Sequence, residues 1–188
     1  LVNAQNRTTG GWRYKPGEEG DTSVVGWQVM ALKSAQMAGL KVPDSAFAGA
    51  SRWLDSAAAG SNASQYCYVP GQESSPTMTS VGLLCRQYLG ANARDPLMIG
   101  GVRHLLDNVP ERSIENIYFW YYASQVMHNM NNSDWDVWNR KMRRILVDAQ
   151  CRDKGCCALG SWDPSGDAWG KQGGRLMMTS LATLTLEV

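Results

Sequence analysis

The chain has 188 residues, of which 44% are hydrophobic and 19% charged, as in an ordinary folded domain. A formal net charge of +1 gives no electrostatic reason to bind nucleic acid or an anionic membrane, so neither partner is expected. No apolar stretch approaches the roughly 20 residues that a membrane-spanning helix requires, and no membrane span is predicted.

The two ends of the chain resemble each other. Leu1 to Gln5 (LVNAQ) matches Leu146 to Gln150 (LVDAQ), and Gly11-Trp12 matches Ser161-Trp162. A unit that recurs within one chain indicates a repeat protein. Because the first unit starts in its middle, we expect the chain to be a piece of a longer protein.

The first repeat is predicted to be a loop followed by two helices. The loop RYKPGEEG is followed by Asp21 or Thr22 as a helix cap, and then by a helix over 22–39 that is apolar on nearly every face. Gly39 and Pro43 end it. A second, amphipathic helix begins at Asp44 and ends before Gly60.

The same pattern recurs three times. In the second repeat Thr79 matches Thr22 and is predicted to open an apolar helix, and Asp95-Pro96 opens its amphipathic partner. Ser113 and Ser133 are predicted to cap the two helices of the third repeat. In the fourth, which opens near Gly160, Thr179 starts the last apolar helix.

These patterns predict an all-α fold built of helical-hairpin repeats over 10–60, 64–110, 113–150 and 159–188, in a single domain. Helices that are apolar all round need cover on both sides, so they suit the inner layer of a closed or partly closed α/α toroid with the amphipathic helices outside. The four inner-type and three outer-type helices predicted would form an incomplete ring.

The repeats resemble a known superfamily. Gln followed by Gly-x-Trp after an amphipathic helix resembles the QW repeat of squalene–hopene cyclases, and the Gly/Pro loop followed by Thr-Ser-apolar resembles the repeat of protein prenyltransferase β-subunits. The whole chain is similar to this α/α-toroid superfamily, and most similar to its uncharacterised bacterial members. The resemblance implies an α/α toroid around a central cavity.

The catalytic motifs of the superfamily are not matched. The DxDD motif of the cyclases does not occur; Asp134-Trp-Asp136 is the nearest pattern besides Asp163 and Asp167. Asp153-Lys-Gly-Cys156 partly resembles the prenyltransferase zinc ligands, but no His follows it. We therefore predict no metal and no cofactor, and leave enzymatic activity open.

The resemblance also places the loops before the inner helices at one cavity mouth. Aromatic walls with carboxylates suit either an apolar isoprenoid, through π stabilisation of a carbocation, or a sugar-like molecule. The structural alternative is that Trp12 and Trp162 join one repeat to the next and Asp21 caps a helix. The candidate residues are Trp12, Tyr14, Asp21, Tyr66, Tyr68, Trp162, Asp163, Asp167 and Trp169.

Five cysteines do not fix a cellular compartment. Three of them lie before the fourth repeat, where a disulfide of Cys151 with Cys156 or Cys157, free thiols, and a thiolate zinc site are the alternatives. Cys85 is predicted to be an inert core thiol, and His128 a structural histidine.

We therefore predict an α/α-toroid module that binds a ligand, a protein partner or the remainder of the toroid. The alternatives are an isoprenoid-processing enzyme whose acid lies outside this segment and a carbohydrate-processing toroid enzyme, because a fold alone does not decide function.

Overall fold

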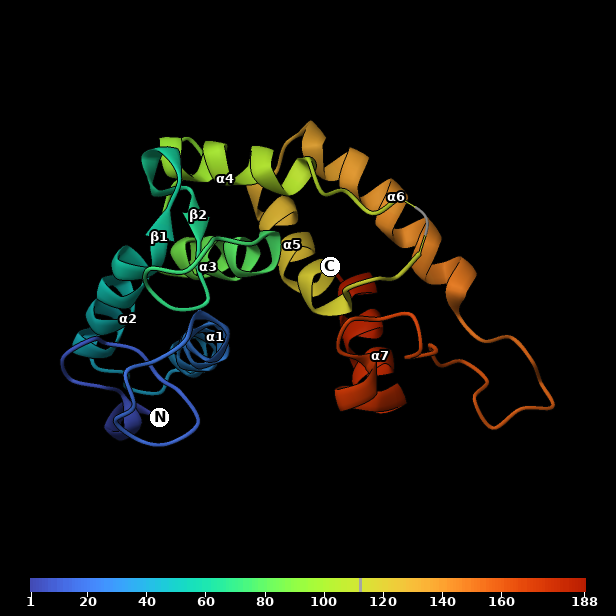
Figure 1. The fold of residues 1–188 in the computed structure, drawn as a ribbon, viewed down its shortest axis with the longest axis horizontal. Coiled ribbons are helices and arrows are strands. Elements are labelled where there is room, and N and C mark those ends of the chain that lie inside the picture. The colour runs from blue at the N-terminus through green and yellow to red at the C-terminus, as the bar shows by residue number, and fades with distance from the viewer. Residues whose placement is uncertain (112) are drawn as a thin grey trace. The chain divides into compact units, whose positions relative to one another are not determined.

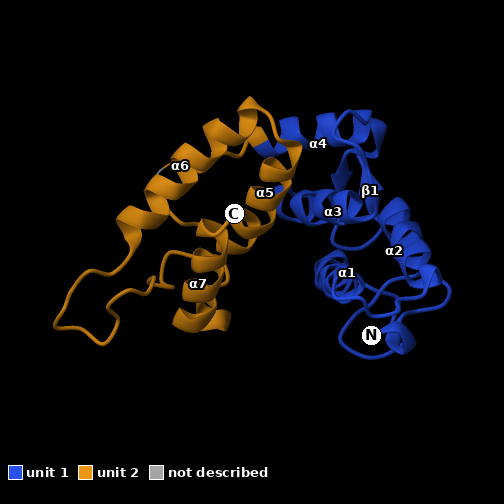
Figure 2. Cartoon of the chain, turned by 180° about the vertical axis from the view of Figure 1, so that it is seen from behind, with its two compact units in different colours: residues 1–105 blue, residues 106–188 orange. Residues whose placement is uncertain are grey.

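The computed structural model describes residues 1–111 and 113–188, and this part of the chain is mainly helical (Figure 1). The all-α prediction is therefore confirmed. The chain divides into two compact units, Leu1–Leu105 and Leu106–Val188, which we call unit 1 and unit 2 (Figure 2). The predicted repeats 10–60 and 64–110 fall in unit 1 apart from residues 106–110, and the other two fall in unit 2.

Unit 1 is built around α1, which packs on both α2 and α3. Its two short strands pair in antiparallel fashion, with Ala58 opposite Tyr66. The elements in chain order are the 3₁₀ turn η1 (Val2–Ala4), α1 (Thr22–Met37), α2 (Asp44–Ala57), β1 (Ala58–Ala59), the 3₁₀ turn η2 (Ser61–Ala63), β2 (Gln65–Tyr66), α3 (Pro76–Tyr88) and α4 (Pro96–Leu106).

The first helix of unit 1 begins where the sequence predicts, but α3 does not. Asp21 is the N-cap of α1, and its side chain accepts a hydrogen bond from the backbone N–H of Val24. Helix α3 begins at Pro76, one turn before Thr79, because Ser75 caps it and proline suits the first helical position. The predicted opening at Thr79 is therefore wrong.

Tyr66 is a core residue of unit 1. Its side chain is fully buried, and a Cβ atom added at Gly82 of α3 would clash with the Tyr66 ring. Glycine is therefore needed for the ring to pack on α3. The Tyr66 hydroxyl accepts a hydrogen bond of 2.9 Å from Nε of Arg86, which also pairs with Asp55 of α2 at 2.6 Å. This network joins α2, β2 and α3.

Unit 2 contains α5 (Ile117–Met130), α6 (Ser133–Ala149) and α7 (Gly170–Leu186), and α5 packs on both α6 and α7. Trp138 of α6 is fully buried against α5. Its indole N–H donates to Ser124 Oγ at 2.8 Å, and its ring meets the Phe119 ring edge-on. The core of the unit therefore lies between the apolar face of α6 and α5.

Three helix starts in unit 2 differ from the predictions. Asn116, and not Ser113, caps α5, because its side chain is the one that accepts from the backbone N–H of Phe119. Asn132 caps α6, so Ser133 is already helical. Helix α7 begins before Thr179 and contains a break at Gly174, whose φ of 64° favours glycine.

Candidate functional site

The N-terminal loop of unit 1 and the loop between α6 and α7 of unit 2 are held by the same side-chain hydrogen bonds. The indole N–H of Trp12 donates to the carbonyl of Leu1 at 3.0 Å, and that of Trp162 to the carbonyl of Leu146 at 2.8 Å. Both tryptophans are almost fully buried. Each therefore fastens its loop to the helical turn before it.

The glutamines that precede these loops are equivalent as well. Gln5 Nε2 donates to the carbonyl of Gly10 at 2.8 Å, and Gln150 Nε2 donates to that of Gly160 at 2.9 Å. Gln5 makes a further bond of 3.0 Å to the carbonyl of Ala46 in α2. The atoms that the repeat shares in sequence are thus the atoms that close the loops.

Backbone pairs complete the match. In unit 1, Asn6 N–H bonds to the Gly11 carbonyl and Gly10 N–H to the Asn6 carbonyl. In unit 2 the corresponding bonds join Cys151 to Ser161 and Gly160 to Cys151. The loop from Gln5 to Gly10 is five residues shorter than the loop from Gln150 to Gly160. The additional residues lie in the cysteine-containing segment, which we call the thiol loop (151–160).

Asp21 and the two neighbouring tyrosines of unit 1 form a polar cluster around the start of α1. Asp21 is fully buried, accepts from the Ser23 hydroxyl at 2.6 Å, and lies 3.6 Å from Nε of Arg13. Burial, with the nearby Tyr14 hydroxyl and Asp21 carboxylate, raises the pKa of Tyr68 to about 12. Tyr68 therefore stays a neutral phenol at physiological pH, and Asp21 serves as a helix cap.

Asp167 caps a helix that is distant in sequence. One carboxylate oxygen accepts from the backbone N–H of Ile117 at 2.6 Å, at the start of α5, and the other accepts from the Trp169 N–H at 2.8 Å. The side chain is 8% exposed. A carboxylate in this position satisfies a backbone donor of the first helical turn and favours the helix dipole. Its role is to fix the loop before α7 on α5.

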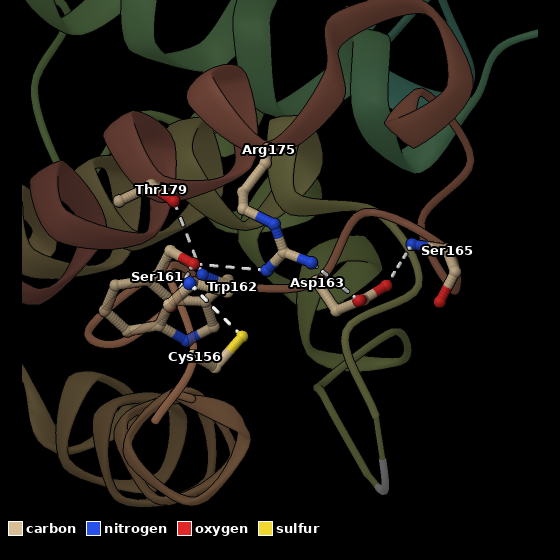
Figure 3. A network of polar contacts seen from close by, with 8 residues as sticks. Cys156, Ser161, Trp162, Asp163, Ser165, Arg175 and Thr179 are labelled. Carbon is tan, nitrogen blue, oxygen red and sulfur yellow. Dashed lines mark hydrogen bonds and ion pairs between the residues drawn. The ribbon is translucent and has the colours of Figure 1, made fainter. Parts of the chain in front are cut away.

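Asp163 is the accessible carboxylate of the fourth repeat. Its two oxygens accept from Ser165 N–H and from Arg175 Nη2, each at 2.8 Å, and Arg175 Nη1 donates to Ser161 Oγ at 3.1 Å (Figure 3). The hydrogen bonds from Ser165, with that from Arg175, lower the pKa of Asp163 to about 2. Asp163 is therefore ionised at neutral pH and does not have the raised pKa of a general acid.

A cleft of about 880 Å³ lies in unit 2 beside Asp163. Helix α6 provides Lys141 and Arg144 on one wall, and the loop after Trp162 provides Ser165 on another. The remaining lining residues are Glu111, Ser113, Ile114, Ile145, Asp148, Ala149, Trp162, Asp163 and Gly166. The lining combines carboxylates, cations and hydroxyls with a few aliphatic groups, so it presents both hydrogen-bond donors and acceptors.

No protein-family model, curated protein or solved structure matches the chain. The resemblance to the cyclase and prenyltransferase superfamily thus stays a prediction.

The nine candidate residues divide between the units, with Trp12, Tyr14, Asp21, Tyr66 and Tyr68 in unit 1 and Trp162, Asp163, Asp167 and Trp169 in unit 2. Within unit 2, Trp162 and Asp163 line the same cleft. Tyr14 and Trp169 are exposed. That all nine residues lie at one cavity mouth stays a prediction.

All five cysteines are free thiols in the structure, which corresponds to one of the alternatives left open by the sequence. Cys85 is buried, and its burial raises its pKa to about 12, as expected of an inert core thiol. Burial also raises the pKa of Cys67. In the described ranges, no cluster of three or more His, Cys, Asp or Glu side chains is arranged to hold a metal ion. Nor does any helix in those ranges have the length and apolar character needed to cross a membrane.

The site contains residues that were not among the nine candidates. Arg175 organises Ser161 and Asp163, and Lys141 and Arg144 line the cleft. The run of bases from Arg140 to Arg144 was the available signal, because an amphipathic helix presents residues three apart, such as 141 and 144, on one face.

Proposed function

We propose that the chain is a non-catalytic repeat module and that the cleft of unit 2 binds a polar, sugar-like molecule. The observation that carries the proposal is the lining of this cleft, where Lys141 and Arg144 supply donors and Asp163 and Glu111 supply acceptors. A polyhydroxyl ligand both donates and accepts hydrogen bonds, so it complements such a mixed surface better than a hydrocarbon does.

The positions of the carboxylates support binding over acid catalysis. Asp21 and Asp167 are buried and occupied by backbone N–H groups at helix starts. Asp163, the carboxylate of this loop that lines the cleft, has a lowered pKa. A cyclase-type step needs a carboxylic acid that is protonated before it meets an alkene, and Asp163 at neutral pH is a carboxylate.

The tryptophan of the cleft also favours a polar ligand. Trp162 is 3% exposed, and its N–H is bonded to the Leu146 carbonyl. Its ring therefore offers little free aromatic surface to an isoprenoid, and seven of the twelve residues that line the cleft carry a charge or a hydroxyl group.

The α/α toroid is part of the proposal. Repetition of the Trp–Leu and Gln–Gly hydrogen bonds in two units supports a repeat architecture of this kind. A crystal structure of the protein would test it: helices alternating between an inner and an outer layer are expected, and an open arrangement without two layers would contradict it.

Binding is tested by isothermal titration with soluble neutral tetrasaccharides, maltotetraose and cellotetraose, and with geranylgeraniol in detergent as the apolar probe. We expect saturable binding of at least one tetrasaccharide and none of the isoprenoid alcohol. Lys141→Ala and Arg144→Ala should each weaken binding by about ten-fold or more, because a hydrogen bond to a charged group contributes about 1.5–3 kcal/mol.

Arg143→Ala is the matched control, since Arg143 is an exposed arginine of the same helix that does not line this cleft. It should leave the dissociation constant unchanged. Binding of geranylgeraniol alone, or tetrasaccharide binding that survives both Lys141→Ala and Arg144→Ala, would overturn the proposal.

A further inference from the structure

We infer that the thiol loop is a redox modification site in which Cys151 and Cys156 form a reversible disulfide. The inference concerns a segment outside the proposed ligand cleft and does not depend on what the cleft binds. It starts from the contrast between the two loops, which share their closing hydrogen bonds, although only the loop of unit 2 contains thiols, three in number.

The thiols of this loop are accessible, whereas the other two cysteines are buried. Cys157 is exposed and Cys151 and Cys156 are half-buried, but Cys67 and Cys85 lie in the core of unit 1 with raised pKa values. The thiolate is the reactive form of cysteine, so a buried thiol with a raised pKa reacts slowly. An oxidant that is a small disulfide should therefore meet the loop first.

The turns of the loop bring the chain back to Cys151 soon after Cys156. Leu159 N–H bonds to the Cys156 carbonyl at 3.1 Å, and the next residue, Gly160, bonds through its N–H to the Cys151 carbonyl at 2.8 Å. Cys151 N–H in turn bonds to the Ser161 carbonyl at 2.9 Å. One tight turn thus separates Cys156 from the backbone that pairs with Cys151.

The side-chain environments distinguish Cys156 from Cys157 as the partner. The Cys156 sulfur accepts from the Ala158 N–H at 3.4 Å, so it is held against the turn that leads to Gly160 (Figure 3). Cys157 is exposed to solvent. A bridge between the neighbours Cys156 and Cys157 is disfavoured, because adjacent Cα atoms are about 3.8 Å apart and disulfides usually need about 4.4–6.8 Å.

The reaction with oxidised glutathione is a double thiol–disulfide exchange. The Cys151 thiolate attacks one sulfur of glutathione disulfide, and one glutathione thiolate leaves. The Cys156 thiolate then attacks the Cys151 sulfur of the mixed disulfide and releases the second glutathione. The two protein thiols lose two electrons and two protons in total, and glutathione disulfide gains them to become two molecules of reduced glutathione.

The test uses the full chain, incubated with oxidised glutathione, blocked with N-ethylmaleimide and digested with trypsin without reduction. Trypsin cuts after Arg144, Arg152, Lys154 and Lys171, so Cys151 lies in peptide 145–152 and both Cys156 and Cys157 lie in peptide 155–171. We expect mass spectrometry to show these two peptides joined, and joined peptides to disappear when dithiothreitol is added.

Two matched variants identify the partner. Cys157→Ser should still give the joined peptides in most of the chain, whereas Cys156→Ser should reduce their yield at least ten-fold. Circular dichroism of both variants confirms that they are folded. Recovery of all three loop cysteines as maleimide adducts or glutathione mixed disulfides would overturn the inference, as would joined peptides that persist in Cys156→Ser and vanish in Cys157→Ser.

Discussion

The loop that ends at Trp12 and the loop that ends at Trp162 are closed by equivalent hydrogen bonds. Both use a tryptophan N–H to a leucine carbonyl and a glutamine amide to a glycine carbonyl. They differ in length and in what the segment between the shared bonds contains. The same tryptophan and glutamine side chains therefore close both loops. The two loops differ in the residues that lie between these side chains.

The largest effect should come from removing the shared tryptophans. Trp12→Ala in unit 1 and Trp162→Ala in unit 2 each delete a buried ring and remove the indole N–H that bonds to a leucine carbonyl, so each should cost roughly 3–5 kcal/mol in the free energy of unfolding. Urea denaturation followed by circular dichroism measures both. A cost under about 1 kcal/mol for one of them would show that the two closures are not equivalent.

The two loops also differ in which helix their buried aspartate caps. Asp21 caps its own helix, whereas Asp167 caps α5 from another part of the chain. Asp21→Ala and Asp167→Ala should each cost about 1–2 kcal/mol, and thermal unfolding would measure the loss. Amide exchange should also rise at Val24 in the first variant and at Ile117 in the second. Unchanged exchange at Ile117 would contradict the capping role of Asp167.

Replacing the two equivalent glutamines should affect stability unequally. Gln5 makes a second bond to α2 and lies close to Gly49, while the Gln150 amide makes its bond at an exposed site. We expect Gln5→Ala to cost about 1–1.5 kcal/mol and Gln150→Ala about 0.5 kcal/mol or less. Chemical denaturation of both variants measures the difference, and an equal cost would mean that the bond from Gln5 to Ala46 contributes little.

The smallest effect is the pH dependence of Asp163. Because its pKa is lowered to about 2 in the folded state from an ordinary value of 3.8, its contribution is present above about pH 4 and is lost as the pH falls through about 2. Asp163→Asn should therefore flatten the dependence of the unfolding free energy over this acidic range and leave it unchanged near neutrality. The effect is small because the group is exposed. Identical acid profiles of the two proteins would contradict this assignment.

The correspondence between the two loops could be found in the sequence because the matched residues carry the bonding atoms. In the sequence, Trp12 aligns with Trp162 and Gln5 aligns with Gln150. The side chains of each pair make equivalent hydrogen bonds. The residues at which the helices begin were harder to predict from the sequence. Thr79 matches Thr22 in sequence, yet Ser75-Pro76 is the stronger start signal and determines where α3 begins.

The site was only partly predictable for a related reason. Asp163 was singled out, but its partner Arg175 lies beyond an intervening loop, and nothing local indicates their pairing. The Asp167 bond to Ile117 joins residues 50 positions apart, so its capping role required the packing of α7 on α5. Contacts made by tertiary packing leave no periodic trace in the sequence.

The closure described for the thiol loop has a consequence for protein engineering. Its ends are held together by the Cys151–Ser161 and Gly160–Cys151 backbone bonds, so a guest sequence placed between them would start and finish at adjacent points. Doubling the length of a flexible loop costs only about 0.6 kcal/mol of closure entropy. The segment around residues 153–158 is therefore a suitable place to insert an epitope tag or a small reporter domain with little loss of stability.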